Sequence, residues 1–189
     1  MSNFYVTEEE LDSYSEFVRS RMKQTGIHEL DILHALVLGI VGEWFEVQEL
    51  IEQMDSTTSS VDMEKLNGKL RKEHGDMLFY FRASFNILNI TNSRIVYDMD
   101  VGPATTYKSI FRGLGDLLDL TKRRYVYRQE RVLLEQAVVD LWNTICEEWA
   151  DTYGEDYLRI VLVENEEKVT KRYPNGFSTL DSLLKVDEQ

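Results

Sequence analysis

The chain has 189 residues, of which 43% are hydrophobic, and it carries a formal net charge of −13 at pH 7. This length and apolar content suit one domain, residues 1–189, that folds around its own core. The negative charge argues against a protein that binds nucleic-acid polymers by neutralising their phosphates. A small phosphorylated ligand could still bind through metal ions and local cations.

The single cysteine, Cys146, excludes an internal disulfide framework. The first residues, MSNFYVTEEE, lack the basic and apolar regions of a signal peptide, so we expect a cytoplasmic protein. The richest apolar run, residues 32–45, is interrupted by His34 and Glu43 and is shorter than the roughly 20 residues of a membrane span. We therefore expect a soluble protein with no membrane partner.

Two prolines and ten glycines leave long uninterrupted stretches, which predicts an all-α helical bundle of about six helices. Thr7 with Glu10 has the pattern of a capping box, which begins a short first helix that we expect to end at Gly26. The second helix is predicted over residues 28–54 from apolar residues at steps of three and four, namely Leu30, Leu33, Val37, Ile40, Trp44, Val47, Ile51 and Met54.

A wholly polar run, residues 55–60, predicts a connection to the third helix, over residues 61–89. The inner stripe of that helix consists of Leu66, Leu70, Met77, Phe81, Ser84, Phe85 and Leu88. Residues 89–106 contain Gly102-Pro103 and predict a break. Three further helices are predicted over residues 107–128, 129–153 and 155–172, followed by an acidic tail that frays from Thr179.

The two long helices carry matched pairs of carboxylates, Glu43 with Glu46 and Glu73 with Asp76. A spacing of three places each pair on one side of its helix, so antiparallel helices could direct all four at one point. Glu73 lies within the apolar stripe, where an unpaired carboxylate costs several kcal/mol. The pattern favours a hard-metal site, and we expect Mg²⁺ to occupy it. The alternative is that Glu43, Glu46 and Glu49 form a solvated charged face and that Glu73 pairs with an arginine.

Residues that flank these pairs have weaker signals. Glu49 continues away from the apolar stripe and is at best an outer-shell or third-metal ligand. Gly42 and Gly75 precede Glu43 and Asp76 directly, and each would allow a helix or a ligand to approach closely.

The second half of the chain contains a weak echo of the first. Gly42-Glu43-x-x-Glu46 is repeated as Gly115-Asp116-x-x-Asp119, and Asp76 corresponds to Asp140. The position that corresponds to Glu73 is Ala137, so the second copy lacks a complete ligand set. Two helical hairpins can share such short motifs by chance. The alternative is an internal duplication, in which the metal-binding hairpin, residues 28–90, is repeated as a degenerate second half, residues 104–178.

These motifs resemble those of the all-α nucleoside triphosphate pyrophosphohydrolases, the MazG-like and dimeric dUTPase-like superfamily. The first match is Gly42-Glu-Trp-Phe-Glu-Val-Gln-Glu49 with Lys72-Glu-His-Gly-Asp76, after Leu33-His-Ala-Leu36. The second is Asn165-Glu-Glu-Lys168, followed by Lys171-Arg-Tyr-Pro-Asn-Gly-Phe177. Two separated motifs in the family's order are more specific than either alone.

The resemblance implies a helical bundle, usually oligomeric, that cleaves a nucleoside triphosphate between the α and β phosphates. It implies Mg²⁺ as the cofactor, with Mn²⁺ as a substitute, and a homo-oligomer. The catalytic metal ligands would be Glu43, Glu46, Glu73 and Asp76. The substrate contacts would be Asn165, Lys168 and Arg172, to phosphate or sugar.

The chain also departs from the family pattern. Gly42 stands where a MazG motif has the first of two adjacent glutamates, and the residues between the two matched regions, 30–90 and 157–178, are an insertion. A decayed second copy would explain these departures, because the first half keeps the carboxylates and the second keeps Asn165 and Lys168. We therefore predict a fused pseudo-dimer with one composite metal site per chain.

Other functions remain open from the sequence. A phosphoribosyl-ATP pyrophosphohydrolase would use the same chemistry, and a catalytically silent nucleotide-binding or assembly protein would keep the same bundle. A di-iron or di-manganese bundle usually requires Glu-x-x-His pairs, which the chain lacks.

Further residues have a plain structural alternative. The aromatic side chains of Trp44, Phe45, Phe79 and Tyr80 could stack a base or fill the core. A basic group consists of Lys122, Arg123, Arg124, Arg128 and Arg131. It could bind phosphate or form a salt-bridged face. The histidines, His28, His34 and His74, have no metal-ligand spacing, and His34 is expected to be packed and hydrogen-bonded.

Overall fold

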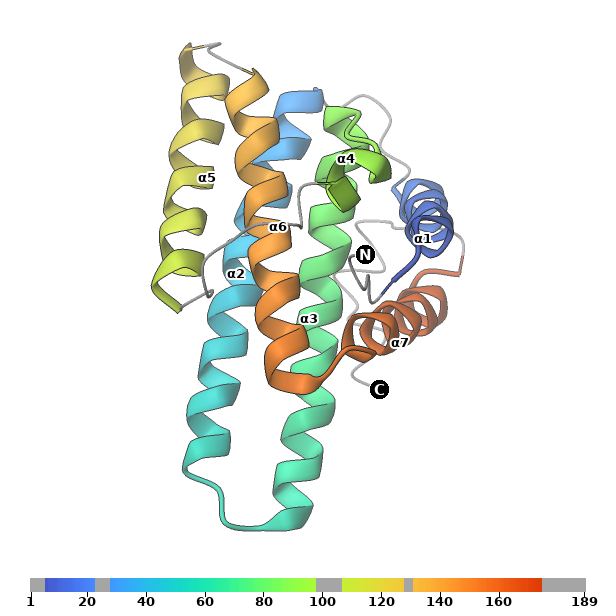
Figure 1. The fold of residues 1–189 in the computed structure, drawn as a ribbon, viewed down its shortest axis with the longest axis vertical. Coiled ribbons are helices and arrows are strands. Elements are labelled where there is room, and N and C mark those ends of the chain that lie inside the picture. Colours follow the sequence, from blue (N-terminus) through green and yellow to red (C-terminus); the bar gives the residue numbers. More distant parts are fainter. Residues whose placement is uncertain (1–5, 23–27, 98–106, 128–130, 175–189) are drawn as a thin grey trace.

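The computed structural model describes residues 6–22, 28–97, 107–127 and 131–174. These residues form seven α-helices and no strand, which confirms the predicted all-α fold (Figure 1). The helices are α1 (Glu8–Arg21), α2 (Glu29–Asp55), α3 (Ser60–Leu88), α4 (Asn92–Tyr97), α5 (Tyr107–Tyr127), α6 (Arg131–Tyr153) and α7 (Tyr157–Arg172).

The ends of the helices follow from local chemistry. The predicted capping box begins α1, because Thr7 Oγ1 accepts a bond from the Glu10 amide and the Glu10 carboxylate accepts one from the Thr7 amide, at 2.7 Å. His28 caps α2 through Nδ1, which accepts a bond from the Leu30 amide. The sequence analysis missed this cap because histidine is not a usual N-cap residue.

Several predicted features need a correction or lie outside the described residues. The short helix α4 falls in residues 89–106, which we expected to be a break, and it follows Asn89, whose φ of 56° ends α3. The first helix ends at Arg21, with Met22 as its C-cap, before the predicted end at Gly26. Gly26, the Gly102-Pro103 pair and the tail from Thr179 lie outside the described residues.

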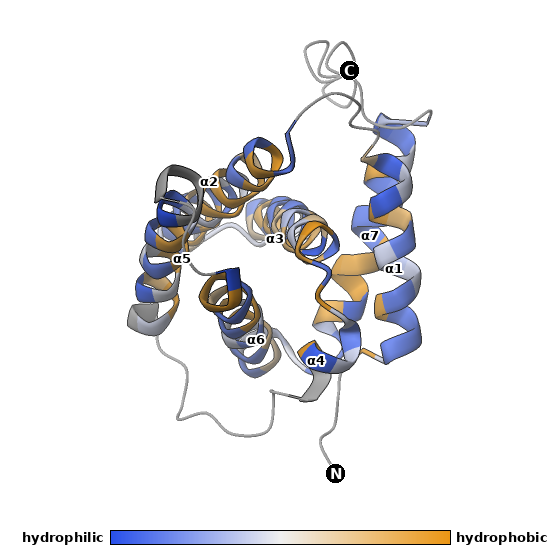
Figure 2. Cartoon of the chain, turned by 90° about the horizontal axis from the view of Figure 1, so that it is seen from above, coloured by the Kyte–Doolittle hydropathy of each residue, from blue (hydrophilic) through white to orange (hydrophobic). Residues whose placement is uncertain are grey.

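Two helical hairpins build the body of the molecule. The first, α2 with α3, is the longer, and its connecting turn extends beyond the ends of the other helices (Figure 1). The second, α5 with α6, packs on one flank of the first, through α5 against α2 and α6 against α3. Seen from above, α1 and α7 lie side by side on the other flank of α3 (Figure 2). The central helix α3 therefore contacts both flanks.

An aromatic cluster joins the two hairpins. The ring of Trp142 on α6 contacts those of Phe81 and Phe85 on α3 edge-on, at centroid distances of 5.7 and 5.4 Å. The three side chains are almost wholly buried. Because buried aromatic side chains contribute more to stability than smaller residues, this cluster fixes α6 against α3.

The connection between α6 and α7 redirects the chain. Gly154 follows the last residue of α6 with a φ of 97°, a conformation that side chains with a Cβ disfavour. After this turn α7 packs against α3. The helix α7 thus reaches the middle of the first hairpin.

None of the helices in the described part of the chain combines the length and the apolar character that a bilayer crossing requires.

We predict that Trp142→Ala lowers the free energy of unfolding by about 3–5 kcal/mol, because it leaves a cavity between α3 and α6. Chemical denaturation measures this change. The control is Val132→Ala on the same helix, where the side chain is 69% exposed, and we expect a change below about 0.5 kcal/mol. Equal effects of the two substitutions would contradict the proposed anchoring role.

Candidate metal centre

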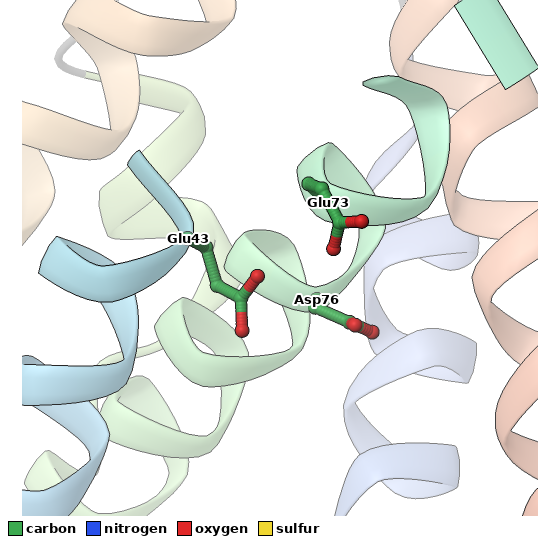
Figure 3. A group of neighbouring side chains, drawn as sticks. All are labelled: Glu43, Glu73 and Asp76. Carbon is green, nitrogen blue, oxygen red and sulfur yellow. The ribbon is translucent and has the colours of Figure 1, made fainter. Parts of the chain in front are cut away.

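Three carboxylates from the first hairpin converge at its middle. Glu43 extends from α2 toward α3, where Glu73 and Asp76 lie one turn apart (Figure 3). One oxygen of each residue lies within 4.8 Å of the others, and all three side chains are half-buried. The structure thus brings together three of the four predicted ligands.

The electrostatics of this cluster favour a bound cation. Burial, followed by the charges of Asp76, Glu46 and Glu73, raises the pKa of Glu43 to about 8. Burial also raises the pKa of Glu73, and the nearby ammonium of Lys168 opposes this change. Protons therefore partly neutralise the cluster when no metal ion is bound, and a cation would stabilise its ionised form.

The helix α7 places two side chains on Asp76. Lys168 Nζ lies 2.5 Å from Asp76 Oδ2, and Asn165 Nδ2 donates a bond of 3.2 Å to Asp76 Oδ1. The ion pair is shielded, because the Lys168 and Asp76 side chains are only 17% and 23% exposed. Each oxygen of Asp76 thus has its own partner on α7.

The amide of Asn165 is held by the protein at both ends. It is 2% exposed, and its Oδ1 accepts a bond of 2.7 Å from the hydroxyl of Tyr14 on α1. The amide thus lies between Tyr14 and Asp76, and the predicted contact of Asn165 with substrate stays a prediction. The sequence carried no signal for the participation of Tyr14.

The two glycines beside the acidic pairs differ. A Cβ added to Gly75 would lie 2.9 Å from both Cβ and Nδ2 of Asn165, so the absence of a side chain lets α7 approach α3. A Cβ added to Gly42 would meet no atom within 4 Å. The structure thus shows a close helix approach at Gly75. At Gly42 no described part of the protein comes close, and the approach of a ligand there stays a prediction.

A small pocket of about 90 Å³ adjoins the cluster. Its walls are Arg21, Asp76, Phe79, Tyr80, Lys168, Val169, Arg172 and Tyr173. The predicted substrate contacts Lys168 and Arg172 thus share one pocket. Burial, followed by the charges of Glu43 and Asp76, raises the pKa of Tyr80 to about 12, so its hydroxyl keeps its proton at neutral pH.

Arg21 is a pocket residue that the sequence analysis missed. Its guanidinium donates to the carbonyl oxygens of Tyr173 and Pro174, at 2.9 and 3.1 Å, and to Thr170 Oγ1 at 3.3 Å. A basic residue in the last turn of a helix has an ordinary capping role, so nothing in the sequence pointed to this position. The remainder of the matched motif, residues 175–177, lies outside the described residues.

The other predicted ligands lie at the edge of the cluster. Glu46 is exposed and outside the group of three, although its charge contributes to the raised pKa of both Glu43 and Glu73. Glu49 is exposed one turn further along α2. Their roles as metal ligand and outer-shell ligand stay predictions.

The donor set suits a hard divalent cation. Carboxylate oxygens are the protein ligands that Mg²⁺ prefers, at about 2.1 Å, so two of them on one ion lie at most about 4.2 Å apart. The carboxylates of Glu43, Glu73 and Asp76 are close to this spacing. Small side-chain rotations would bring them onto one ion.

The second hairpin has a groove in the corresponding place. A groove of about 520 Å³ between α5 and α6 is lined by the four residues that correspond to the first-half carboxylates, namely Asp116, Asp119, Ala137 and Asp140. Asp119 pairs with Arg123 at 2.7 Å, and Asp140 accepts a bond from Gln136 at 2.8 Å. In the described part of the chain, only the first hairpin forms a metal-type cluster. The duplication itself stays a prediction.

The remaining candidate residues have structural surroundings. His74 is buried, its pKa is lowered by burial to about 3, its Nδ1 bonds the Tyr157 hydroxyl, and its ring stacks on Trp149. Trp44 is a core residue, and Phe45 is 52% exposed.

Part of the basic group forms salt bridges, in line with the alternative that it is a salt-bridged face. Arg123 pairs with Asp119, and Arg131 pairs with Glu135 and donates to the Leu88 carbonyl oxygen. Arg128 lies outside the described residues.

Comparisons of the chain with protein-family models, curated proteins and solved structures find no match. The family resemblance of the sequence motifs therefore stays a prediction.

We predict that the metal-free protein loses stability as the pH rises from about 5 to about 8. Glu43 has a pKa of about 8 when folded against an ordinary value of 4.5, so in this range the folded protein binds more protons than the unfolded chain. Unfolding measured at each pH with a chelator present tests this. Glu43→Gln should flatten the decline, whereas the exposed control Glu49→Gln should leave it intact. A profile that Glu43→Gln does not change would contradict the assignment.

We also predict that Gly75→Ala lowers the free energy of unfolding by about 1–3 kcal/mol, because the new methyl group forces α7 away from α3. Gly68→Ala is the matched control on the same helix, where an added Cβ meets nothing within 4 Å. It should instead raise stability by about 0.5–1 kcal/mol, because alanine favours helix. Effects of the same sign, measured by chemical denaturation, would argue against a tight contact at Gly75.

Proposed function

We propose that this protein is a Mg²⁺-dependent pyrophosphohydrolase that converts a nucleoside triphosphate to the monophosphate and pyrophosphate. The observation that carries the proposal is the convergence of Glu43, Glu73 and Asp76, half-buried and adjacent to a pocket with basic side chains. The order of the Glu-x-x-Glu, Glu-x-x-Asp and Asn-x-x-Lys motifs adds the family resemblance. A noncanonical or deoxynucleoside triphosphate is the proposed substrate.

The residues of the site have distinct roles in this proposal. The carboxylates of Glu43, Glu73 and Asp76 would hold the ion, with Glu46 beside them. A bound Mg²⁺ would supply an activated water and would screen the charge of the triphosphate. Lys168 and Arg172, on the wall of the adjoining pocket, would bind the phosphates and stabilise charge that develops on pyrophosphate.

The charge of the whole protein makes this local arrangement necessary. A net charge of −13 repels a polyanionic substrate at long range. Binding therefore requires a metal ion and side-chain cations at one place. The contact of Lys168 with Asp76 puts a cation directly beside the acidic cluster.

One competing metal chemistry is disfavoured by a specific contact. A di-iron or di-manganese carboxylate bundle needs histidine ligands that project inward. His74, which is adjacent to Glu73 in sequence, instead bonds Tyr157 and stacks on Trp149. The group of three in the described residues contains carboxylates alone.

The test is pyrophosphate release from a panel of canonical, noncanonical and deoxynucleoside triphosphates, with phosphoribosyl-ATP included, in the presence of Mg²⁺, Mn²⁺ or a chelator. We expect metal-dependent release that Glu73→Gln reduces at least about 100-fold, because removal of a ligand should cost at least as much as removal of an outer-shell partner. Glu52→Gln, which changes an exposed carboxylate of α2 outside the predicted ligand set, should retain most of the activity.

The outcomes separate the alternatives. Absence of release from every nucleotide, or activity that Glu73→Gln leaves intact, would refute the proposed function. Thermal stabilisation by a nucleotide without turnover would instead support a catalytically silent binding protein. Release from phosphoribosyl-ATP alone would change the substrate while leaving the site assignment in place.

A further inference from the structure

We propose that Tyr14 and Asn165 are positioning residues that hold Asp76 in the orientation required of a metal ligand, and that Lys168 is an exchangeable counter-ion which a divalent metal displaces from Asp76. This inference rests on the proposed metal centre and goes beyond it. It assigns Asn165 a role through Asp76 instead of a contact with substrate. It also gives Lys168 two successive partners, first Asp76 and then the phosphates.

The orientation of the Asn165 amide supports the positioning role of Tyr14 and Asn165. The Tyr14 hydroxyl can donate its proton to an amide oxygen, and the bond of 2.7 Å assigns Oδ1 to Tyr14. The amide nitrogen then faces Asp76 Oδ1, to which it donates at 3.2 Å. Tyr14 and Asn165 are only 1% and 2% exposed, so water does not readily replace either bond. A carboxylate held in this way cannot rotate freely.

The helix α1 reinforces this arrangement at a second point. Arg21 lies two turns beyond Tyr14 on α1 and donates to Thr170 and to the carbonyl oxygens of Tyr173 and Pro174. Tyr14 and Arg21 thus hold successive parts of α7 and its carboxyl end. Gly75 allows the approach of α7 to α3 that these bonds require. These hydrogen bonds from α1 therefore fix the position of α7 relative to Asp76.

The two carboxylate oxygens of Asp76 have different partners, and this difference supports the role of Lys168 as an exchangeable counter-ion. Oδ1 accepts from an amide, which is neutral and can remain while the other oxygen binds a metal ion. Oδ2 accepts from the Lys168 ammonium at 2.5 Å, and a divalent cation at that oxygen would repel the ammonium. Metal binding and the Lys168–Asp76 ion pair therefore compete for Oδ2.

The displaced ammonium has a defined destination. Lys168 and Asp76 both line the small pocket, with Arg172 on the same wall. The lysine side chain is long and flexible, so its ammonium can leave Asp76 and stay in the pocket. There it would meet the phosphates of a metal-bound nucleotide. One residue thus compensates the acidic cluster before metal binding and the substrate after it.

The first experiment measures Mn²⁺ affinity by electron paramagnetic resonance and thermal stability with and without Mg²⁺ in Lys168→Met. Without metal the variant should unfold at a lower temperature than wild type, because the acidic cluster loses its cation. Its Mn²⁺ affinity should rise about tenfold, as expected when a charge-assisted competitor is removed. The increase in unfolding temperature that Mg²⁺ produces should exceed that of wild type, while pyrophosphate release should fall.

The matched control is Lys171→Met, which removes the same charge from an exposed position of α7. It should leave Mn²⁺ affinity within about twofold of wild type, the small effect of an exposed charge. Lys168→Gln, which retains a polar side chain, provides a second variant if Lys168→Met does not fold. Unchanged or weaker Mn²⁺ binding in the Lys168 variants would overturn the counter-ion role.

The second experiment compares Tyr14→Phe with Tyr157→Phe. Each removes one hydroxyl that bonds a side chain, Asn165 at 2.7 Å and His74 at 2.8 Å respectively. Tyr14→Phe should weaken Mn²⁺ binding about tenfold, the effect of losing an outer-shell partner, whereas Tyr157→Phe should not. Equal Mn²⁺ affinities in the two variants would overturn the positioning role.

The wild-type measurements distinguish the two levels of failure. A wild-type protein that binds no Mn²⁺ and releases no pyrophosphate would overturn the metal centre and this inference together. A wild-type protein that binds metal and hydrolyses nucleotide, while the Tyr14 and Lys168 variants match their controls, would overturn this inference alone.

Discussion

Carboxylates that share a half-buried space repel one another, and the centre of this molecule is arranged around that repulsion. The mutual charges of Glu43, Glu73 and Asp76 and their partial burial favour protonation of Glu43. The ammonium of Lys168 opposes the effect and comes from α7, far from the hairpin in sequence. The acidic cluster of the first hairpin is thus compensated by a cation from another helix. The proposed site therefore forms only when α7 packs against α3.

That docking explains several otherwise separate features of the fold. Gly154 lets the chain turn after α6, and Gly75 gives the returning helix room against α3. The helix α1 also packs against α7, and its Tyr14 and Arg21 bond residues of α7 and its end. The helices α1 and α7 therefore both shape the proposed site, although neither contributes a carboxylate to the cluster of three.

The sequence alone predicted what depends on local order. Apolar spacing in Glu29–Asp55 and Ser60–Leu88 located both long helices to within a residue, and the position of Glu73 in an apolar stripe located the acidic cluster. Contacts between distant segments left no such signal. Tyr14 and Asn165 are 151 positions apart, and tyrosine at a buried helix position is an ordinary core residue. The pattern could name Asn165 and Lys168 as functional, but not which atoms they would meet.

The acidic residues of the two hairpins differ in where their counter-ions come from. In the groove between α5 and α6, Asp119 is paired with Arg123 one turn away on its own helix, so its counter-ion is present whenever the helix forms. In the first hairpin Asp76 is paired with Lys168, which belongs to a different helix and borders an open pocket. A counter-ion within the same helix turn stays close to its carboxylate. We propose that a counter-ion supplied across a tertiary contact exchanges for a metal ion, which would suit the first hairpin to the proposed chemistry.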